Sequence, residues 1–194
     1  MDKNFYNRKF KANPGLWSDG DRDEMVWEIC SSIGRFDFVL DIGCGNGHTL
    51  KYFQERDLEL ELVGVDWSEE AIDLAQQGLD AELIVVNFSE LDWSRQFDLV
   101  LNLGTLEHFE DLRASLLKLR GLIVDGGFCY FEAPNNLSYS PGEESYRRLK
   151  RGSHQMEWHL SKRSWEKFLF EVGFQIIDEY KGPKAWYEFV WLLL

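Results

Sequence analysis

A carboxylate and three closely spaced glycines stand together early in the chain, and this combination suits the binding of a ligand. Asp41 ends an apolar run, and Gly43, Gly45 and Gly47 follow at alternate positions before a segment with a helical pattern. Glycine has no Cβ, so the backbone lets a ligand approach closely. A dinucleotide-binding loop would need a further glycine where His48 stands. A carboxylate beside the loop favours a cationic or amino-bearing ligand over a phosphate.

Histidines supply the candidates for proton transfer, because histidine titrates near neutral pH. His108 follows an apolar run at residues 97–103 and is the first candidate for a general base. The alternative interpretation is that His108 only shapes a pocket or caps the next helix. His154 and His159 lie in or just beyond a long polar connection, and they are the further catalytic candidates.

Apolar runs and amphipathic segments alternate along the chain, which predicts one α/β domain with a parallel sheet covered by helices. The predicted strands cover residues 36–42, 58–66, 82–88, 97–103, 128–133, 174–180 and 186–194. The last two are joined by a predicted hairpin at 181–184 and therefore run antiparallel to each other. Helices are predicted at 47–56, from Ser68 as N-cap to Gly78, at 111–122 and at 161–172. We expect a single domain over residues 1–194.

Composition narrows the classes of partner. The chain has 34 acidic and 21 basic residues and a net charge of −13, which disfavours nucleic acid and anionic membranes as partners. The three cysteines are far apart in sequence and form no disulfide or zinc pattern. The first residues are polar and contain no apolar run, so we expect no signal peptide and a cytoplasmic location. No feature of the sequence indicates an oligomeric state.

Six ordered segments resemble the class I S-adenosylmethionine-dependent methyltransferases, in particular the small-molecule branch that includes the ubiquinone-biosynthesis O-methyltransferases. They read VLDIGCGNG (39–47), VGVDWS (63–68), FDLVLNL (97–103), LEHF (106–109), GGF (126–128) and GF (173–174). The resemblance covers about residues 30–190. It implies a doubly wound, seven-stranded, mostly parallel sheet, the Rossmann-like methyltransferase fold, with an antiparallel C-terminal strand.

The same resemblance implies S-adenosylmethionine as cofactor. Asp66 would accept hydrogen bonds from both ribose hydroxyls, and Trp67 and Phe88 would flank the adenine. Position 87 is often Asp in this family; Asn87 departs from that pattern but keeps an acceptor oxygen for the adenine amino group. The expected cofactor-binding set is Asp41, Gly43, Cys44, Gly45, Gly47, Asp66, Trp67, Asn87, Phe88, Asn102 and Leu103. The alternative interpretation is that these are turn glycines and core aromatics.

No metal site is expected. Glu107, His108 and His159 invite comparison with metal-dependent small-RNA 2′-O-methyltransferases, which carry Glu-x-x-Glu-His and a later histidine. The first glutamate of that pattern would fall at Gly104, so a ligand is missing.

Two segments outside the predicted core are candidates for substrate contact. Residues 1–20 are aromatic and glycine-containing and resemble a lid that folds over the cofactor in related enzymes; packing against the sheet is the alternative. Residues 135–160 form the predicted substrate-side connection, with a basic cluster at 147–151 that could reach an anionic group or only form a solvated helix face.

These interpretations lead to a methyltransferase that acts on oxygen or nitrogen of a small-molecule metabolite. Two alternatives stay open. One is a catalytically silent cofactor-binding module that serves a partner, and the other is an RNA or protein methyltransferase.

Overall fold

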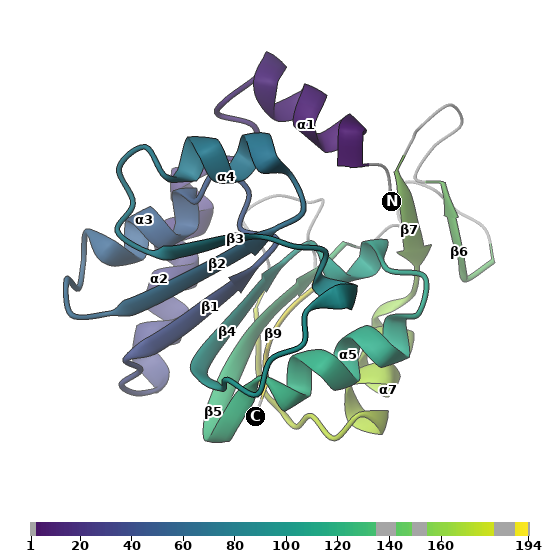
Figure 1. Ribbon diagram of the computed structural model, residues 1–194. Coiled ribbons are helices and arrows are strands. Elements are labelled where there is room, and N and C mark those ends of the chain that lie inside the picture. Colours follow the sequence, from purple (N-terminus) through teal and green to yellow (C-terminus); the bar gives the residue numbers. More distant parts are fainter. Residues whose placement is uncertain (1–2, 135–142, 149–154, 181–188, 194) are drawn as a thin grey trace.

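A sheet with helices on both faces organises the chain (Figure 1). The computed structural model describes residues 3–134, 143–148, 155–180 and 189–193. The strand order is β3-β2-β1-β4-β5-β9-β8, and a second sheet pairs β6 with β7. The strands of the main sheet are β1 (Phe38–Ile42), β2 (Glu61–Asp66), β3 (Glu82–Val85), β4 (Phe97–Leu103), β5 (Ile123–Ala133), β8 (Ile176–Tyr180) and β9 (Phe189–Leu193).

The first five strands are parallel, and β9 pairs antiparallel with both β5 and β8. The predicted α/β class and the mostly parallel sheet are therefore confirmed. The predicted turn at 181–184 lies outside the described residues. The chain moves outward from β1 to β3 and then returns to β4, so the strand order reverses between β1 and β4. In such sheets ligands bind at the carboxyl ends of the strands, at that point of reversal.

Helices cover both faces of the sheet. They are α1 (Lys3–Ala12), α2 (Gly20–Ile33), α3 (His48–Gln54), α4 (Glu69–Ala75), α5 (Leu112–Gly121) and α7 (Lys162–Glu171), with short 3-10 turns η1 (Phe88–Glu90) and η2 (Leu106–His108). Ser68 and Ser161 cap α4 and α7 as predicted, since each hydroxyl accepts a backbone N–H three residues on. Among the described helices, none is long and apolar enough to cross a membrane.

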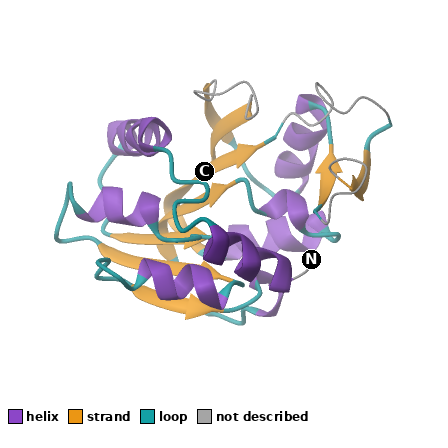
Figure 2. Ribbon diagram, turned by 90° about the horizontal axis from the view of Figure 1, so that it is seen from above, coloured by secondary structure: helices purple, strands orange, loops and turns teal. Residues whose placement is uncertain are grey.

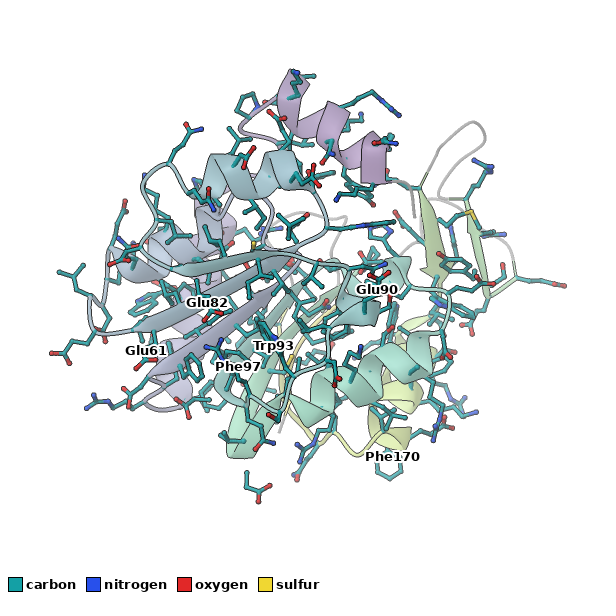
Figure 3. All side chains as sticks on the ribbon, in the orientation of Figure 1. Glu61, Glu82, Glu90, Trp93, Phe97 and Phe170 are labelled. Carbon is teal, nitrogen blue, oxygen red and sulfur yellow. The ribbon has the colours of Figure 1, made fainter. Side chains whose placement is uncertain are left out.

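Two apolar clusters lie on opposite faces of the sheet because successive strand residues point to opposite sides. Leu40 and Ile42 of β1 pack with α5 and α7, whereas Val39 packs with α2 and α3. Helix α7 itself is amphipathic: Trp165 is fully buried, and Phe170 lies on the outer side, 79% exposed (Figure 3). Asp41 is two residues after Val39 in the strand, so its side chain points to the same face of the sheet, toward α2.

The structure corrects several predicted boundaries. Strand β5 begins at Ile123, not at Phe128, because the predicted turn at 125–127 is an irregularity inside the strand, with Gly126 at φ +82°. β1 and β2 begin two and three residues later than predicted. Helices α1 and α2 were not predicted, since neither follows an apolar run of the kind that marks the other elements.

The predicted connection at 135–160 contains a pair of strands that the sequence pattern did not indicate. β6 (Ser145–Arg148) and β7 (Met156–His159) pair antiparallel. β6 is polar throughout, so it lacks the alternation of apolar and polar residues by which a half-buried strand is predicted. Figure 2 shows this small sheet beside the main sheet and not as its continuation.

Candidate functional site

A cavity of about 310 Å³ lies at the carboxyl ends of β1, β2 and β4, where the strand order reverses. This volume is in the range of small-ligand sites. Its lining includes these predicted residues: Asp41, Gly43, Cys44, Gly45, Asp66, Trp67, Asn87, Phe88, Leu103 and His108. Gly47, Asn102 and His159 do not line it, and His154 lies outside the described residues.

The glycine loop turns tightly because its backbone is anchored to the neighbouring strand. The N–H groups of Gly43 and Cys44 both donate to the carbonyl oxygen of Val65, at 2.8 and 3.0 Å. Gly43 has φ +74°, a conformation that glycine adopts readily and other residues do not. A Cβ at Gly43 would lie 2.3 Å from Oγ1 of Thr105. The loop therefore requires glycine here on both conformational and steric grounds.

Gly47 has a packing role. It also has a positive φ, at the N-cap of α3, and a Cβ there would lie 2.9 Å from the Cβ of Ala75 in α4. Asn102 is likewise buried below the cavity: its side chain donates to the carbonyl of Glu132 and accepts from the N–H of Leu106. Asn102 thus holds the start of η2 against β5.

Asp66 connects the end of β2 to the glycine loop. Its Oδ2 accepts from the N–H of Gly45 at 2.9 Å, and its Oδ1 accepts from the N–H of Ser68 at 2.7 Å. Burial raises the pKa of Asp66, and these backbone hydrogen bonds work against that rise. The two carboxylate oxygens have about four acceptor positions between them, so the backbone hydrogen bonds from Gly45, Trp67 and Ser68 leave one open for a ligand.

The side chains after β3 form the far wall of the cavity. Phe88 is 4% exposed, and its ring meets Phe109 edge-on with centroids 5.9 Å apart. The Oδ1 atom of Asn87 already accepts from the N–H of Ser89 at 3.1 Å, which caps η1. Asn87 therefore keeps one lone pair of that oxygen for a ligand.

The inner end of the cavity is lined by the buried carboxyl group of Asp41 and by Arg22. The Oδ1 atom of Asp41 is buried without a hydrogen-bond partner among the described residues. Burial raises the pKa of Asp41 to about 7, although the charge of Arg22 opposes the rise. Arg22, from α2, lies 4.0 Å from the carboxylate of Glu132, whose pKa burial also raises to about 7. Arg22 was missed from the sequence because α2 was not predicted.

His108 stands between two carboxyl groups. Its Nδ1 lies 3.0 Å from the carbonyl oxygen of Met156, which can only accept, so Nδ1 carries the proton. In a neutral ring Nε2 is then the nitrogen with a lone pair, and it lies 4.0 Å from Oε1 of Glu107. On the other side, Oε1 of Glu157 is 3.9 Å from Nδ1. The arrangement leaves Nε2 able to take a proton.

The β6-β7 pair holds the η2 segment in place. The hydroxyl of Tyr146 donates to the carbonyl of His108 at 2.6 Å, and Nε1 of Trp158 donates to the carbonyl of Phe109 at 2.9 Å. Glu157 and Gln155 reach the cavity from the same strand region. The predicted connection thus contributes both to the cavity wall and to the position of His108.

Helix α1 of the N-terminal segment packs against α4 (Figure 1), and residues of this segment line the cavity. Phe10 of α1 is buried and packs above Gly45. Tyr6 and Trp17 also line the cavity. The Nδ2 group of Asn46 donates to the carbonyl of Pro14 at 2.8 Å, which ties this segment to the glycine loop.

The remaining candidates lie elsewhere. His159 is buried in β7, opposite Ser145, and burial together with the charge of Arg147 lowers its pKa. Arg147 and Arg148 belong to β6 and do not line the cavity; the rest of the basic cluster lies outside the described residues. The described residues contain no group of three or more His, Cys, Asp or Glu that could hold a metal.

Comparisons with known proteins identify relatives of this chain. Residues 40–129 match a family of methyltransferase domains, Methyltransf_12. Ubiquinone biosynthesis O-methyltransferase of Rhizobium etli is 30% identical over 152 residues, 72% of this chain and 60% of that protein. Protein-lysine N-methyltransferase EFM4 of Saccharomyces cerevisiae is 32% identical over 136 residues, 60% of this chain and 56% of that protein. The chain thus spans 60% or less of the length of these two curated relatives.

A solved structure shares the fold over almost the whole chain. It is 1,6-didemethyltoxoflavin-N1-methyltransferase of Burkholderia thailandensis, with bound 1,6-didemethyltoxoflavin and S-adenosylhomocysteine. The TM-score is 0.78 at 20% identity, and the match covers 98% of this chain and 85% of that one. At this identity the likeness establishes the fold, which is the Rossmann-like fold of such enzymes.

Proposed function

Since this chain carries a class I S-adenosylmethionine-dependent methyltransferase domain, we propose that it transfers a methyl group to oxygen or nitrogen of a small molecule. The cofactor of such a domain is S-adenosylmethionine, which supplies a methyl group activated by a positively charged sulfur.

The observation that carries the proposal is the set of acceptor groups around the glycine loop. The cofactor bears an amino group, a positive sulfur and a ribose diol, and it has no phosphate. Asp66 offers a carboxylate with an open acceptor position for the diol. The buried Oδ1 of Asp41 has no hydrogen-bond partner among the described residues and suits the amino group. Arg22 suits the carboxylate of the methionine part, and Gly43 and Gly45 permit close approach.

The adenine end of the cavity fits the same cofactor. Trp67 and Phe88 offer apolar walls, and Asn87 offers an amide that can meet the adenine amino group. The residues that would hold the adenine lie at the β3 side of the cavity, and those that would hold the methionine part lie at the α2 side. The part of the cavity between α1, η2 and β7 would then be left for the acceptor.

The residues at that end position the acceptor and manage its proton. Holding two reactants in a reactive orientation accounts for roughly 7–11 kcal/mol of barrier reduction in model reactions. Nε2 of His108 is placed to take the acceptor proton. Tyr6, Phe10 and Trp17 line the cavity and reduce its contact with water.

A small acceptor is supported by the volume of the cavity, about 310 Å³, and by the residues of α1 that line it. It is also in keeping with the names of two similar proteins, an O-methyltransferase of ubiquinone biosynthesis and an N1-methyltransferase solved with 1,6-didemethyltoxoflavin. The similarity to a protein-lysine N-methyltransferase makes a protein acceptor the second candidate.

Calorimetry with S-adenosylhomocysteine tests cofactor binding. Asp66→Ala should weaken binding by about 1–3 kcal/mol, because a charged acceptor for two hydroxyls is lost. The matched control is Asp73→Ala, which removes an exposed carboxylate from the outer side of α4 and should leave the affinity unchanged. Equal affinity in wild type and Asp66→Ala would remove Asp66 from the site.

Turnover is tested with cofactor carrying a labelled methyl group, mixed with a protein-free metabolite extract or with a protein extract. Label in small molecules supports the proposal, and label in protein supports the second candidate. If S-adenosylhomocysteine binds and no label is transferred to either extract, the chain acts as a silent cofactor-binding module.

A further inference from the structure

The acceptor end of the cavity is more acidic than a neutral acceptor requires. Beyond the residues assigned to the cofactor, the lining at this end consists of Tyr6, Glu107, His108, Gln155 and Glu157, with aromatic rings at its rim. The inference drawn from it rests on the proposed function, because it names the chemical class of the acceptor.

Glu107 is a buried carboxyl group with an unused oxygen. It lies in η2, is 3% exposed and lines the cavity. Its Oε2 atom has no hydrogen-bond partner among the described residues, and its Oε1 lies 4.0 Å from Nε2 of His108. Burial first, and the neighbouring charge of Glu157 second, raise its pKa. A buried carboxyl group with an oxygen that lacks a hydrogen-bond partner is stabilised most by a ligand that brings a positive charge and N–H donors.

Glu157 places a second carboxyl group at the same end. It is 5% exposed on β7, and its Oε1 lies 3.9 Å from Nδ1 of His108. Its cross-strand neighbour Arg147 does not line the cavity. Among the described lining residues, Arg22 is the one lysine or arginine, and it lies at the opposite end, 4.0 Å from Glu132.

The charges at the acceptor end therefore discriminate between classes of acceptor. A carboxylate or phosphate brings no N–H donor for the unused oxygen of Glu107, and Arg147, which lies opposite Glu157 across the strand pair, does not line the cavity where it could bind such an anion. An alcohol would leave the second oxygen of Glu107 with a weaker partner than an ammonium group does.

We propose that the acceptor is a primary or secondary amine, which enters the cavity as the ammonium ion and is held by Glu107, whose ionised form the positive charge of the ligand stabilises; Glu157 is a second carboxyl group at the same end. The rings of Tyr6, Trp17 and Phe109 surround the carbon skeleton that carries the amine. Cation–π attraction to these rings favours the same charged form.

The reaction balances with His108 as the base. One N–H bond of the ammonium breaks, and its proton moves to Nε2 of His108, which leaves a lone pair on nitrogen. That lone pair forms a bond to the methyl carbon while the carbon–sulfur bond of S-adenosylmethionine breaks, and the bonding electrons stay on sulfur. The products are S-adenosylhomocysteine and a methylated ammonium, and His108 then releases its proton to solvent.

The test compares two probes with the same carbon skeleton, benzylamine and benzyl alcohol, binding to protein saturated with S-adenosylhomocysteine at pH 7. Titration followed by ligand-observed NMR measures each affinity. A charge-assisted hydrogen bond to a buried carboxylate favours benzylamine by about ten- to a hundredfold. Glu107→Gln should remove most of this preference. Glu110→Gln, which removes an exposed charge three residues away, should keep it.

Several results would overturn the inference. These are equal or tighter binding of benzyl alcohol, no binding of benzylamine to the S-adenosylhomocysteine complex, or an unchanged preference in Glu107→Gln. The comparison of benzylamine with benzyl alcohol in the wild-type protein does not depend on any variant. If Glu107→Gln does not fold, Glu157→Gln can be used instead, and it should lower the preference for benzylamine. Failure to bind S-adenosylhomocysteine at all contradicts the proposed function instead, so the two failures are distinguishable.

Discussion

One added methyl group at Gly43 tests the geometry of the glycine loop directly. In Gly43→Ala the new Cβ would lie 2.3 Å from Oγ1 and 2.7 Å from Cγ2 of Thr105, far inside van der Waals contact. The loop cannot easily move away, because the N–H groups of Gly43 and Cys44 are both held by the carbonyl of Val65. The residue must also keep φ +74°.

The expected loss of stability has two sources, the left-handed backbone angle and the steric overlap with Thr105. A non-glycine residue in the left-handed region costs about 1–2 kcal/mol, and overpacking of a buried site costs about 1–3 kcal/mol. Gly43→Ala should therefore lower the free energy of unfolding by about 2–5 kcal/mol, measured by urea unfolding followed by circular dichroism. Gly34→Ala is the matched control, since a Cβ there meets nothing within 4 Å and the backbone is extended, at φ 169°. Its effect should stay within about 0.5 kcal/mol.

The double variant Gly43→Ala, Thr105→Ala separates the steric overlap from the backbone strain. Removal of Oγ1 and Cγ2 takes away the two closest contacts and leaves only the Thr105 Cβ position, at 3.1 Å. The second change should recover about 1–3 kcal/mol of the loss, the size of a coupling between residues in contact. Strict additivity of the two substitutions, or a Gly34→Ala variant as unstable as Gly43→Ala, would refute the reasoning.

Three further predictions concern the site. His108→Gln should lower turnover by about 10²–10⁴-fold at unchanged S-adenosylhomocysteine affinity, because glutamine takes no proton near neutral pH; full turnover would contradict its role as base. Burial holds the pKa of Asp41 and Glu132 at about 7, above their values in the unfolded chain, so the folded state binds these protons more tightly. Urea unfolding should show stability falling as pH rises from about 4 to 7, by up to roughly 1.4 kcal/mol per pH unit for each group, and the slope should be smaller in Asp41→Asn. Removal of residues 1–18 should leave a folded domain with lower turnover and more exposed bound cofactor, detected by quenching of a fluorescent cofactor analogue. Full activity of the shortened chain would mean that the segment only packs against the domain.

The sequence by itself was enough to predict the features that depend on local physics. Apolar runs marked the parallel strands, since strands buried on both faces consist mainly of apolar residues. Gly43 and Gly45 marked the loop because a positive φ and closely packed neighbours favour a residue without a Cβ. Ser68 and Ser161 marked helix starts because their hydroxyls satisfy backbone N–H groups nearby in sequence.

Only the tertiary structure decided which distant side chains meet. Arg22 reaches the inner end of the cavity from α2, and no spacing within the sequence relates it to Asp41 or Glu132. His108 meets the carbonyl of Met156, 48 residues further on, through β7. The alternation of apolar and polar residues in β7 covers only four residues, Met156–His159, and its partner β6 is polar. The position of His108 between Glu107 and Glu157 follows from how β7 folds back against η2, and the packing of the whole chain determines that contact.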